Sequence, residues 1–112
     1  MEERRQFDRV QIPASARVHA EDAEGNRLGR IVMLGRGGCQ VQTSRRFPPD
    51  VTMPLVIVAE LDGIRRHVSA IHRFTLPNGE AGFEFQGIEP EAAVEIGVLV
   101  GKYFPADAAK NG

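Results

Sequence analysis

The sequence predicts an all-β domain that ends in one helix, with six antiparallel strands closed into a small β-barrel. Three observations predict this fold class. Apolar and polar residues alternate over most of the chain, turn signals such as Asn78-Gly79 separate the runs, and the spacing becomes helical after Pro90. A chain of 112 residues is expected to form one domain. Because side chains fill the interior of a small barrel, a ligand is expected on its outside or at a rim.

Six runs of alternating residues are the expected strands. They cover 14–20, 28–34, 39–43, 51–59, 64–74 and a short run that contains Phe83 and Phe85. Pro54 cannot donate to a strand ladder, so it is expected near a sheet edge or at the start of its strand. Two-residue hairpins are expected at Asp62-Gly63 and Asn78-Gly79, and a turn at Gly25-Asn26.

Burial is expected to follow the same alternation. The residues that should share the inner face of the first and fifth strands are Ala14, Ala16, Val18, Ala20, Ile64, Val68, Ala70 and Phe74. Val56 and Val58 make the second face of their strand apolar as well, which predicts that part of this strand is covered on both sides.

The last element is expected to be a helix over 88–105, beginning near Pro90 and ended by Pro105. The residues spaced to pack on the barrel are Ala92, Ile96, Leu99, Val100 and Tyr103. Val94 and Val98 widen this stripe, which suggests a surface for a second copy in a homodimer. The single domain, 1–112, thus divides into a flexible N-terminal segment (1–10), a barrel (11–87), the helix and a tail (106–112).

The charge balance limits the class of partner. Lysine and arginine number 14 against 15 aspartate and glutamate, so general nucleic-acid binding is not expected and any basic site must be local. The apolar runs are too short for membrane insertion. The single cysteine, Cys39, favours a reducing compartment, and no apolar segment follows the charged N-terminus, so a cytoplasmic location is expected.

No arrangement typical of a catalyst is present, and neither enzymatic activity nor a cofactor is expected. His19, His67 and His72 lack metal-ligand spacing and are expected at the surface or at a rim. Cys39 is expected to face inward with Val41 as a small apolar residue. The chain contains no Gly-x-Ser-x-Gly nucleophile motif and no Walker loop.

Two stretches are candidates for a ligand site. Arg4, Arg5 and Arg9 precede the first strand, and Gly35-Arg36-Gly37-Gly38 separates the second strand from the third. Arginine donates two parallel hydrogen bonds to guanine or phosphate and can stack on a base, while glycine lets a backbone approach a ligand closely. Together the two stretches suit a guanine nucleotide, although each alone is also typical of a solvated tail or an ordinary turn.

These residues resemble the PilZ domain, the bacterial receptor module for cyclic di-GMP. Arg5 and Arg9 match its R-x-x-x-R motif, residues 31–42 take the place of its [D/N]-x-S-x-x-G motif, and Gly82-Phe83-Glu84-Phe85 looks like its late strand. The resemblance implies a six-stranded barrel with a helix. It also implies a cyclic di-GMP site outside the barrel, in which the arginines clamp guanine and phosphate.

The second motif departs from the family pattern. With Gly38 as its final glycine, Met33 stands where Asp or Asn is expected and Gly35 where Ser is expected. Two polar contacts are missing, which is expected to weaken binding by about one to three powers of ten. Arg36 can compensate by stacking or by pairing with phosphate.

Two functions therefore remain open. One is a cyclic di-GMP receptor that passes ligand binding to an unidentified effector protein, with Arg4, Arg5, Arg9, Met33, Gly35, Arg36 and Gly38 at the site. The other is a degenerate domain that binds no nucleotide and acts as a protein adaptor in motility or surface attachment.

Overall fold

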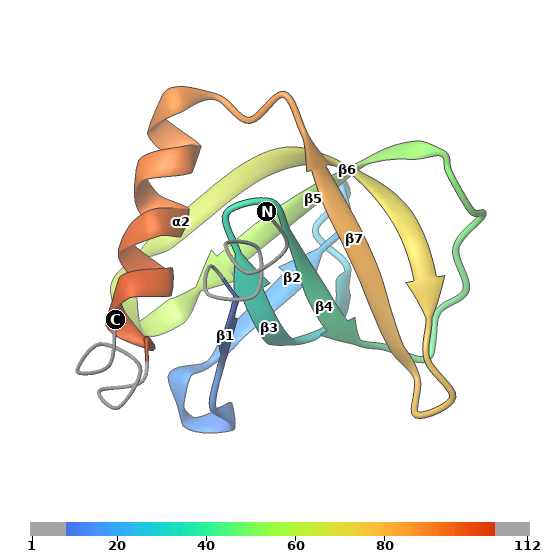
Figure 1. The fold of residues 1–112 in the computed structure, drawn as a ribbon, viewed down its shortest axis with the longest axis horizontal. Helices are drawn as coiled ribbons and strands as arrows, with labels where there is room; N and C mark the ends of the chain where they lie inside the picture. Colours follow the sequence, from blue (N-terminus) through green and yellow to red (C-terminus); the bar gives the residue numbers. More distant parts are fainter. Residues whose placement is uncertain (1–8, 105–112) are drawn as a thin grey trace.

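Antiparallel pairing closes the sheet of the computed structural model, which describes residues 9–104, into a barrel (Figure 1). In chain order the elements are β1 (Val10–Gln11), a 3-10 turn (Ala14–Ala16), β2 (Val18–Glu21), β3 (Arg27–Gly35), β4 (Gly38–Gln42), β5 (Thr52–Ala59), a second 3-10 turn (Glu60–Asp62), β6 (Ile64–Thr75), β7 (Glu80–Gln86) and α2 (Pro90–Lys102). Six strands form the closed ring in the order β3-β2-β5-β6-β7-β4, and β4 returns to β3. The predicted six-stranded barrel with a C-terminal helix is confirmed.

The short strand β1 lies beside this ring. Val10, which the sequence analysis placed in the N-terminal segment, is buried and pairs with Leu34 of β3. The backbone N–H of Ile12 extends the contact by donating to the carbonyl of Val32 at 2.9 Å. The chain is therefore fixed against β3 from Val10 onward, and this pairing positions Arg9 at the end of β3 that leads into β4.

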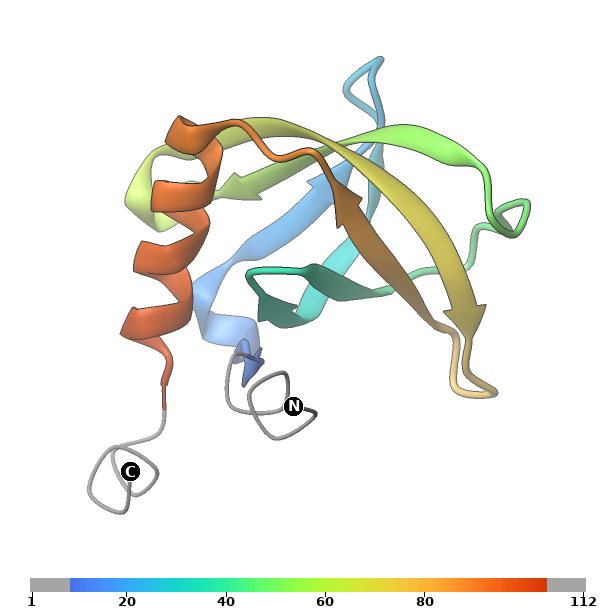
Figure 2. The same cartoon turned by 45° about the horizontal axis from the view of Figure 1, so that its top comes forward.

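The helix α2 stands at one side of the barrel, against β3 and β6 (Figures 1 and 2). Ala92, Ile96, Leu99 and Val100 are buried there, as their spacing predicted. Three ion pairs also hold the helix: Arg66 of β6 pairs with Glu95 and, at 3.8 Å, with Glu91, and Lys102 pairs with Asp62 at 2.7 Å. The helix begins at Pro90, as predicted, and ends at Lys102, so it is shorter than the predicted range 88–105. Pro105, the predicted terminator, lies outside the described residues.

The first predicted strand is wrong in its first half. Residues Ala14–Ala16 form a 3-10 turn in which the Ala16 N–H donates to the carbonyl of Pro13. Arg17 then adopts a left-handed conformation with φ of 58°, and the strand begins only at Val18. In such a turn the backbone N–H groups donate to carbonyls three residues earlier in the chain. The alternation of apolar and polar residues does not reveal a turn of this kind. Ala14 is consequently exposed rather than buried.

The fifth predicted strand is correct, but Phe74 is on the wrong face. The pairing of β6 with β7 shifts register between His72 and Phe74, which is a β-bulge. A bulge inserts one residue and moves the next side chain to the opposite face. His72, which precedes the bulge, shares the inner face with Val68 and Ala70, whereas Phe74, which follows it, is exposed on the outside of the barrel.

The turns and Pro54 follow the sequence more closely. Asn78-Gly79 lies in a turn as predicted, and Gly79 has φ of 91°, but the connection between β6 and β7 is longer than two residues, because it runs from Leu76 to Gly79. The Asp62-Gly63 hairpin is longer than the predicted two residues, because the 3-10 turn Glu60–Asp62 precedes Gly63. Pro54 lies in the first half of β5, which pairs with β6 but not with β2. This half of β5 is therefore an edge, where a proline without a backbone N–H is tolerated.

Two histidines expected at the surface are buried. His72 packs in the barrel against Phe47 and Phe83, with ring centroids 5.7 and 5.5 Å away, and its Nε2 lies 2.9 Å from Thr75 Oγ1. His67 is exposed as predicted. Cys39 faces inward as predicted, and burial raises the pKa of its thiol to about 12.

His19 is buried although it lies on the outer face of β2. Its Nε2 is 2.8 Å from Glu21 Oε2, and the guanidinium of Arg65 donates to both carboxylate oxygens of Glu21. Arg65 belongs to β6 and pairs with Val58 of β5, which pairs in turn with His19 of β2, so the Arg65 side chain reaches across β5 to Glu21. Both faces of β5 are buried from Leu55 to Ala59, as its apolar pattern predicted.

In the part of the chain that the structure describes, no helix has the length and apolar character needed to cross a bilayer.

The Glu21 carboxylate is expected to stabilise the barrel in a pH-dependent way. Hydrogen bonds from Arg65 and His19 hold its pKa below the usual glutamate range. A lowered pKa contributes stability above the unfolded-state value of about 4.3, and this contribution is lost as pH falls through the lower folded-state value. At pH 7, Glu21→Gln should reduce the free energy of unfolding by about 1–2 kcal/mol, and the difference from wild type should shrink below about pH 4.

Urea unfolding followed by circular dichroism at several pH values measures this difference. Glu24→Gln is the control, because Glu24 is exposed in the β2–β3 turn. A Glu21→Gln deficit that stays constant from pH 7 to pH 3 would contradict the assignment.

Candidate functional site

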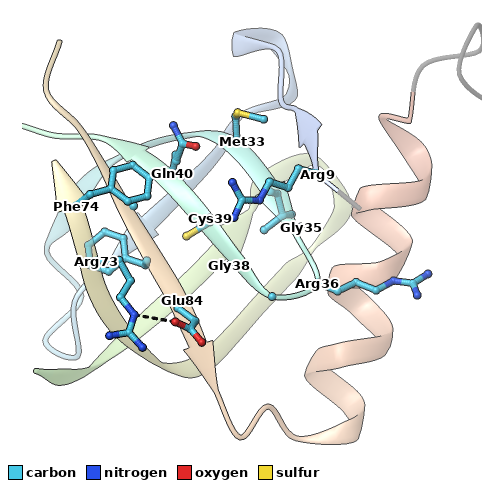
Figure 3. A pocket seen from close by; sticks show the side chains of 14 residues that line it. Arg9, Met33, Gly35, Arg36, Gly38, Cys39, Gln40, Arg73, Phe74 and Glu84 are labelled. Carbon is cyan, nitrogen blue, oxygen red and sulfur yellow. Dashed lines mark hydrogen bonds and ion pairs between the residues drawn. The ribbon is translucent and has the colours of Figure 1, made fainter. Parts of the chain in front are cut away.

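A hollow of about 370 Å³ lies on the outside of the barrel, over β3, β4 and β7 (Figure 3). Its walls come from the end of β1, the β3–β4 turn, β4, the β6 bulge and β7. The lining residues are Arg9, Met33, Leu34, Gly35, Arg36, Gly37, Gly38, Cys39, Gln40, Arg73, Phe74, Gly82, Phe83 and Glu84. The barrel interior is filled by side chains, so a ligand can be held only on such an outer surface.

The strand register explains why the surface is concave here. One row of outward positions crosses four strands as Met33, Gln40, Gly82 and Phe74. The next row crosses them as Gly35, Gly38, Glu84 and Ile71. Glycine occupies three of these eight outward positions. The missing side chains of Gly35 and Gly38 leave a trough bordered by longer side chains, while the Phe74 ring occupies the space beside Gly82.

Gly38 is required by the close approach of β4 to β7. A Cβ at this position would overlap the carbonyl oxygen of Phe83 on the paired strand. The same end of β4 is held by the Phe85 N–H, which donates to the carbonyl of Gly37 at 2.9 Å. The glycine-rich stretch is therefore a two-residue turn, Arg36-Gly37, whose flanking glycines form the floor of the hollow.

Arg9 and Arg36 come from opposite sides of this turn. Arg9 precedes β1, and its side chain extends over the hollow from that side (Figure 3). The side chain of Arg36 points away from the hollow toward α2, where it borders a shallow depression with Ala93, Val94, Gly97 and Val98. Among residues 9–104, neither arginine forms an ion pair with a carboxylate.

Arg73 is a third arginine at the hollow, and its charge is already paired. Its Nε donates to Glu84 at 2.7 Å and its Nη1 to Asp50 at 2.7 Å. These hydrogen bonds raise the pKa of Arg73 and link the β6 bulge to β7 and to the loop before β5. The Arg73–Glu84 pair forms the rim opposite Arg9 (Figure 3).

The structure brings together most of the residues that the sequence analysis selected. Arg9, Met33, Gly35, Arg36 and Gly38 all line the hollow. Arg4 and Arg5 lie outside the described residues, so their placement stays a prediction. Met33 is half-buried and presents a thioether where a polar group was expected, which makes this wall apolar.

Sequence reasoning missed the part of the site contributed by β4, β6 and β7. Gln40, Arg73, Phe74 and Glu84 line the hollow, and none was selected. The Gly82-Phe83-Glu84-Phe85 run was a usable signal, because it marked a strand of the family pattern. The register that places this strand beside Gly38 could not be read from the sequence.

Two solved structures are similar in fold. The crystal structure of the uncharacterized Legionella protein Lpg0364 aligns over 84% of this chain and 90% of its own, with a TM-score of 0.60 and 12% identity. The crystal structure of the PilZ domain of CeSA from a cellulose-synthesizing bacterium aligns over 76% of this chain and 88% of its own, with a TM-score of 0.56 and 23% identity. No curated protein sequence matches the chain.

A family model gives a longer match. The model of the PilZ domain covers residues 3–101, which include Arg5, Arg9, the β3–β4 turn and nearly all of α2. The barrel, the outer hollow and all of α2 except Lys102 lie within the matched region. The chain therefore belongs to the PilZ domain family.

Proposed function

We propose that this domain binds cyclic di-GMP in the hollow over β3, β4 and β7 and passes that binding to a partner protein without catalysis. The observation that carries the proposal is the meeting of Arg9 with the glycine floor formed by Gly35 and Gly38. The volume of about 370 Å³ is within the range of small-molecule sites, enough to take part of a dinucleotide.

The chemistry of the hollow suits an anionic nucleotide. Cyclic di-GMP carries two negative phosphates and two guanines, and an arginine can pair with either group through two hydrogen bonds. Arg9 supplies such a group at the rim, and Arg5 precedes it by four residues along the chain. The glycine floor lets the sugar-phosphate ring approach the strands closely.

The signal is proposed to leave through α2. Arg36 links the two surfaces, because its backbone borders the hollow while its side chain lies beside Val94 and Val98. These valines are 66% and 57% exposed, so they lie outside the buried stripe of α2 that Ala92, Ile96, Leu99 and Val100 form. A cytoplasmic effector protein, or a second copy of this domain, would contact that face.

One observation favours the adaptor function instead. Met33 presents a thioether at the position where a ligand-binding carboxylate or amide would stand, so this position offers no hydrogen bond to a ligand. A domain that kept only the exposed face of α2 would need no nucleotide. Titration with the nucleotide separates the two functions.

Replacing Arg9 should remove most of the nucleotide affinity. A charged hydrogen-bond pair lost from the site is expected to weaken binding of cyclic di-GMP by about 10- to 100-fold, measured by isothermal titration of the full chain. Arg27→Ala is the matched control, because Arg27 is an exposed arginine at the opposite end of β3.

The outcomes separate the two functions. Saturable binding by wild type and by Arg27→Ala, with the loss confined to Arg9→Ala, supports the receptor function. If the wild-type protein shows no saturable binding, the receptor function is contradicted and the adaptor function remains.

Restoring a polar group at position 33 should strengthen binding. In Met33→Asp a carboxylate faces the hollow and can accept hydrogen bonds from guanine N–H groups, which is expected to raise affinity by about two- to tenfold. The same titration, with Met33→Leu as the apolar control, measures the gain. An affinity for Met33→Asp no higher than that of Met33→Leu would contradict the role of this position.

A further inference from the structure

Phe74 is an aromatic residue that the fold turns outward. Simple alternation along β6 would place it in the barrel, but the bulge between His72 and Phe74 puts it on the outer face. There the side chain is 39% exposed and lines the hollow. Bulges commonly re-aim a side chain beside a functional site, whereas an exposed phenylalanine gains nothing for the core.

A glycine on the neighbouring strand holds the Phe74 ring in place. Gly82 pairs with Phe74, and a Cβ at Gly82 would overlap the ring carbons Cζ, Cε1 and Cε2. The ring therefore lies directly on the backbone of β7, in the space that a side chain would otherwise fill. Aromatic cover of a glycine on a paired strand fixes the ring without burying it.

The position of the ring matches what a nucleobase needs. Phe74 is in the same cross-strand row as Met33, with Gln40 and Gly82 between them. Arg9 approaches from one side of the hollow, and the Arg73–Glu84 pair borders it on the other (Figure 3). A flat ring beside cationic groups is the arrangement that nucleotide sites use, because every base has a face that can stack on an aromatic side chain.

We infer that Phe74 is a binding residue on whose ring one purine base of the ligand stacks. This inference rests on the proposed function, since it assigns a further contact within the same hollow. Stacking requires no hydrogen bond to the base edge, so it supplies affinity at a site where Met33 and Gly35 offer none.

The chain offers a direct optical test, because it contains no tryptophan. Phe74→Trp introduces a single indole on the proposed stacking surface, and a stacked base quenches its fluorescence. The probe is cyclic di-GMP added to the full chain. Leu76→Trp is the matched control, since Leu76 has the same exposure of 39% and lies on the same hairpin but does not line the hollow.

A second variant measures the contribution to affinity. Phe74→Leu keeps an apolar group over Gly82 but removes the aromatic face, and it should weaken binding by about five- to 100-fold in isothermal titration. Leu76→Ala should leave the affinity unchanged. Thermal unfolding of each variant shows whether the barrel is intact.

The expected result is saturable quenching in Phe74→Trp, an unchanged signal in Leu76→Trp, and weakened binding in a folded Phe74→Leu. If wild type binds but Phe74→Leu binds equally well, or the Phe74→Trp emission does not change at saturation, the stacking role is overturned and the receptor function stands. If wild type itself does not bind, the receptor function fails, and the stacking role fails with it.

Discussion

The close approach of β4 to its two neighbours is the constraint on which the rest of the structure depends. A Cβ at Gly38 would overlap the carbonyl oxygen of Phe83 on β7, and a Cβ at Gly29 would overlap the carbonyl oxygen of Gln42 on β4. Only glycine allows backbones to pack this closely. Because β4 joins β3 to β7, these contacts close the barrel, and the missing side chain of Gly38 also deepens the outer hollow. Closure of the fold and formation of the site therefore have one cause.

Much of the fold could be predicted because its elements obey simple periods. Alternation located five of the six barrel strands to within a few residues, and helical spacing identified the buried face of α2. Of the site, the family motif led to Arg9, Met33, Gly35, Arg36 and Gly38, which the register of β3 and β4 brings to one hollow. The alternation, the helical spacing and the motif residues each lie within a short stretch of the chain, so they can be recognised in a single sequence.

The features that could not be predicted arise from contacts between distant strands. His19 is buried because Arg65, 46 positions further along the chain, reaches across β5 to Glu21. Phe74 is outward because the β6 bulge changes which residues alternate inward, and a bulge has no signal in the apolar pattern. The β6–β7 wall of the hollow stayed hidden for the same reason, since register between strands decides which residues share it.

The departures at Met33 and Gly35 weigh less than the arginines for a physical reason. A neutral hydrogen bond contributes about 0.5–1.5 kcal/mol, whereas a hydrogen bond to a charged group contributes about 1.5–3 kcal/mol. The binding free energy lost with two neutral hydrogen bonds is thus no larger than the free energy that two charged hydrogen bonds supply, or that one charged hydrogen bond and a stacked base supply together. In the hollow, Met33 is apolar and Gly35 has no side chain, while Arg9 and the Phe74 ring lie in the same lining. A ligand held in this way would depend on charge and on the face of its base more than on the base edge, so we expect weaker discrimination between guanine and adenine than a site with both polar residues would have.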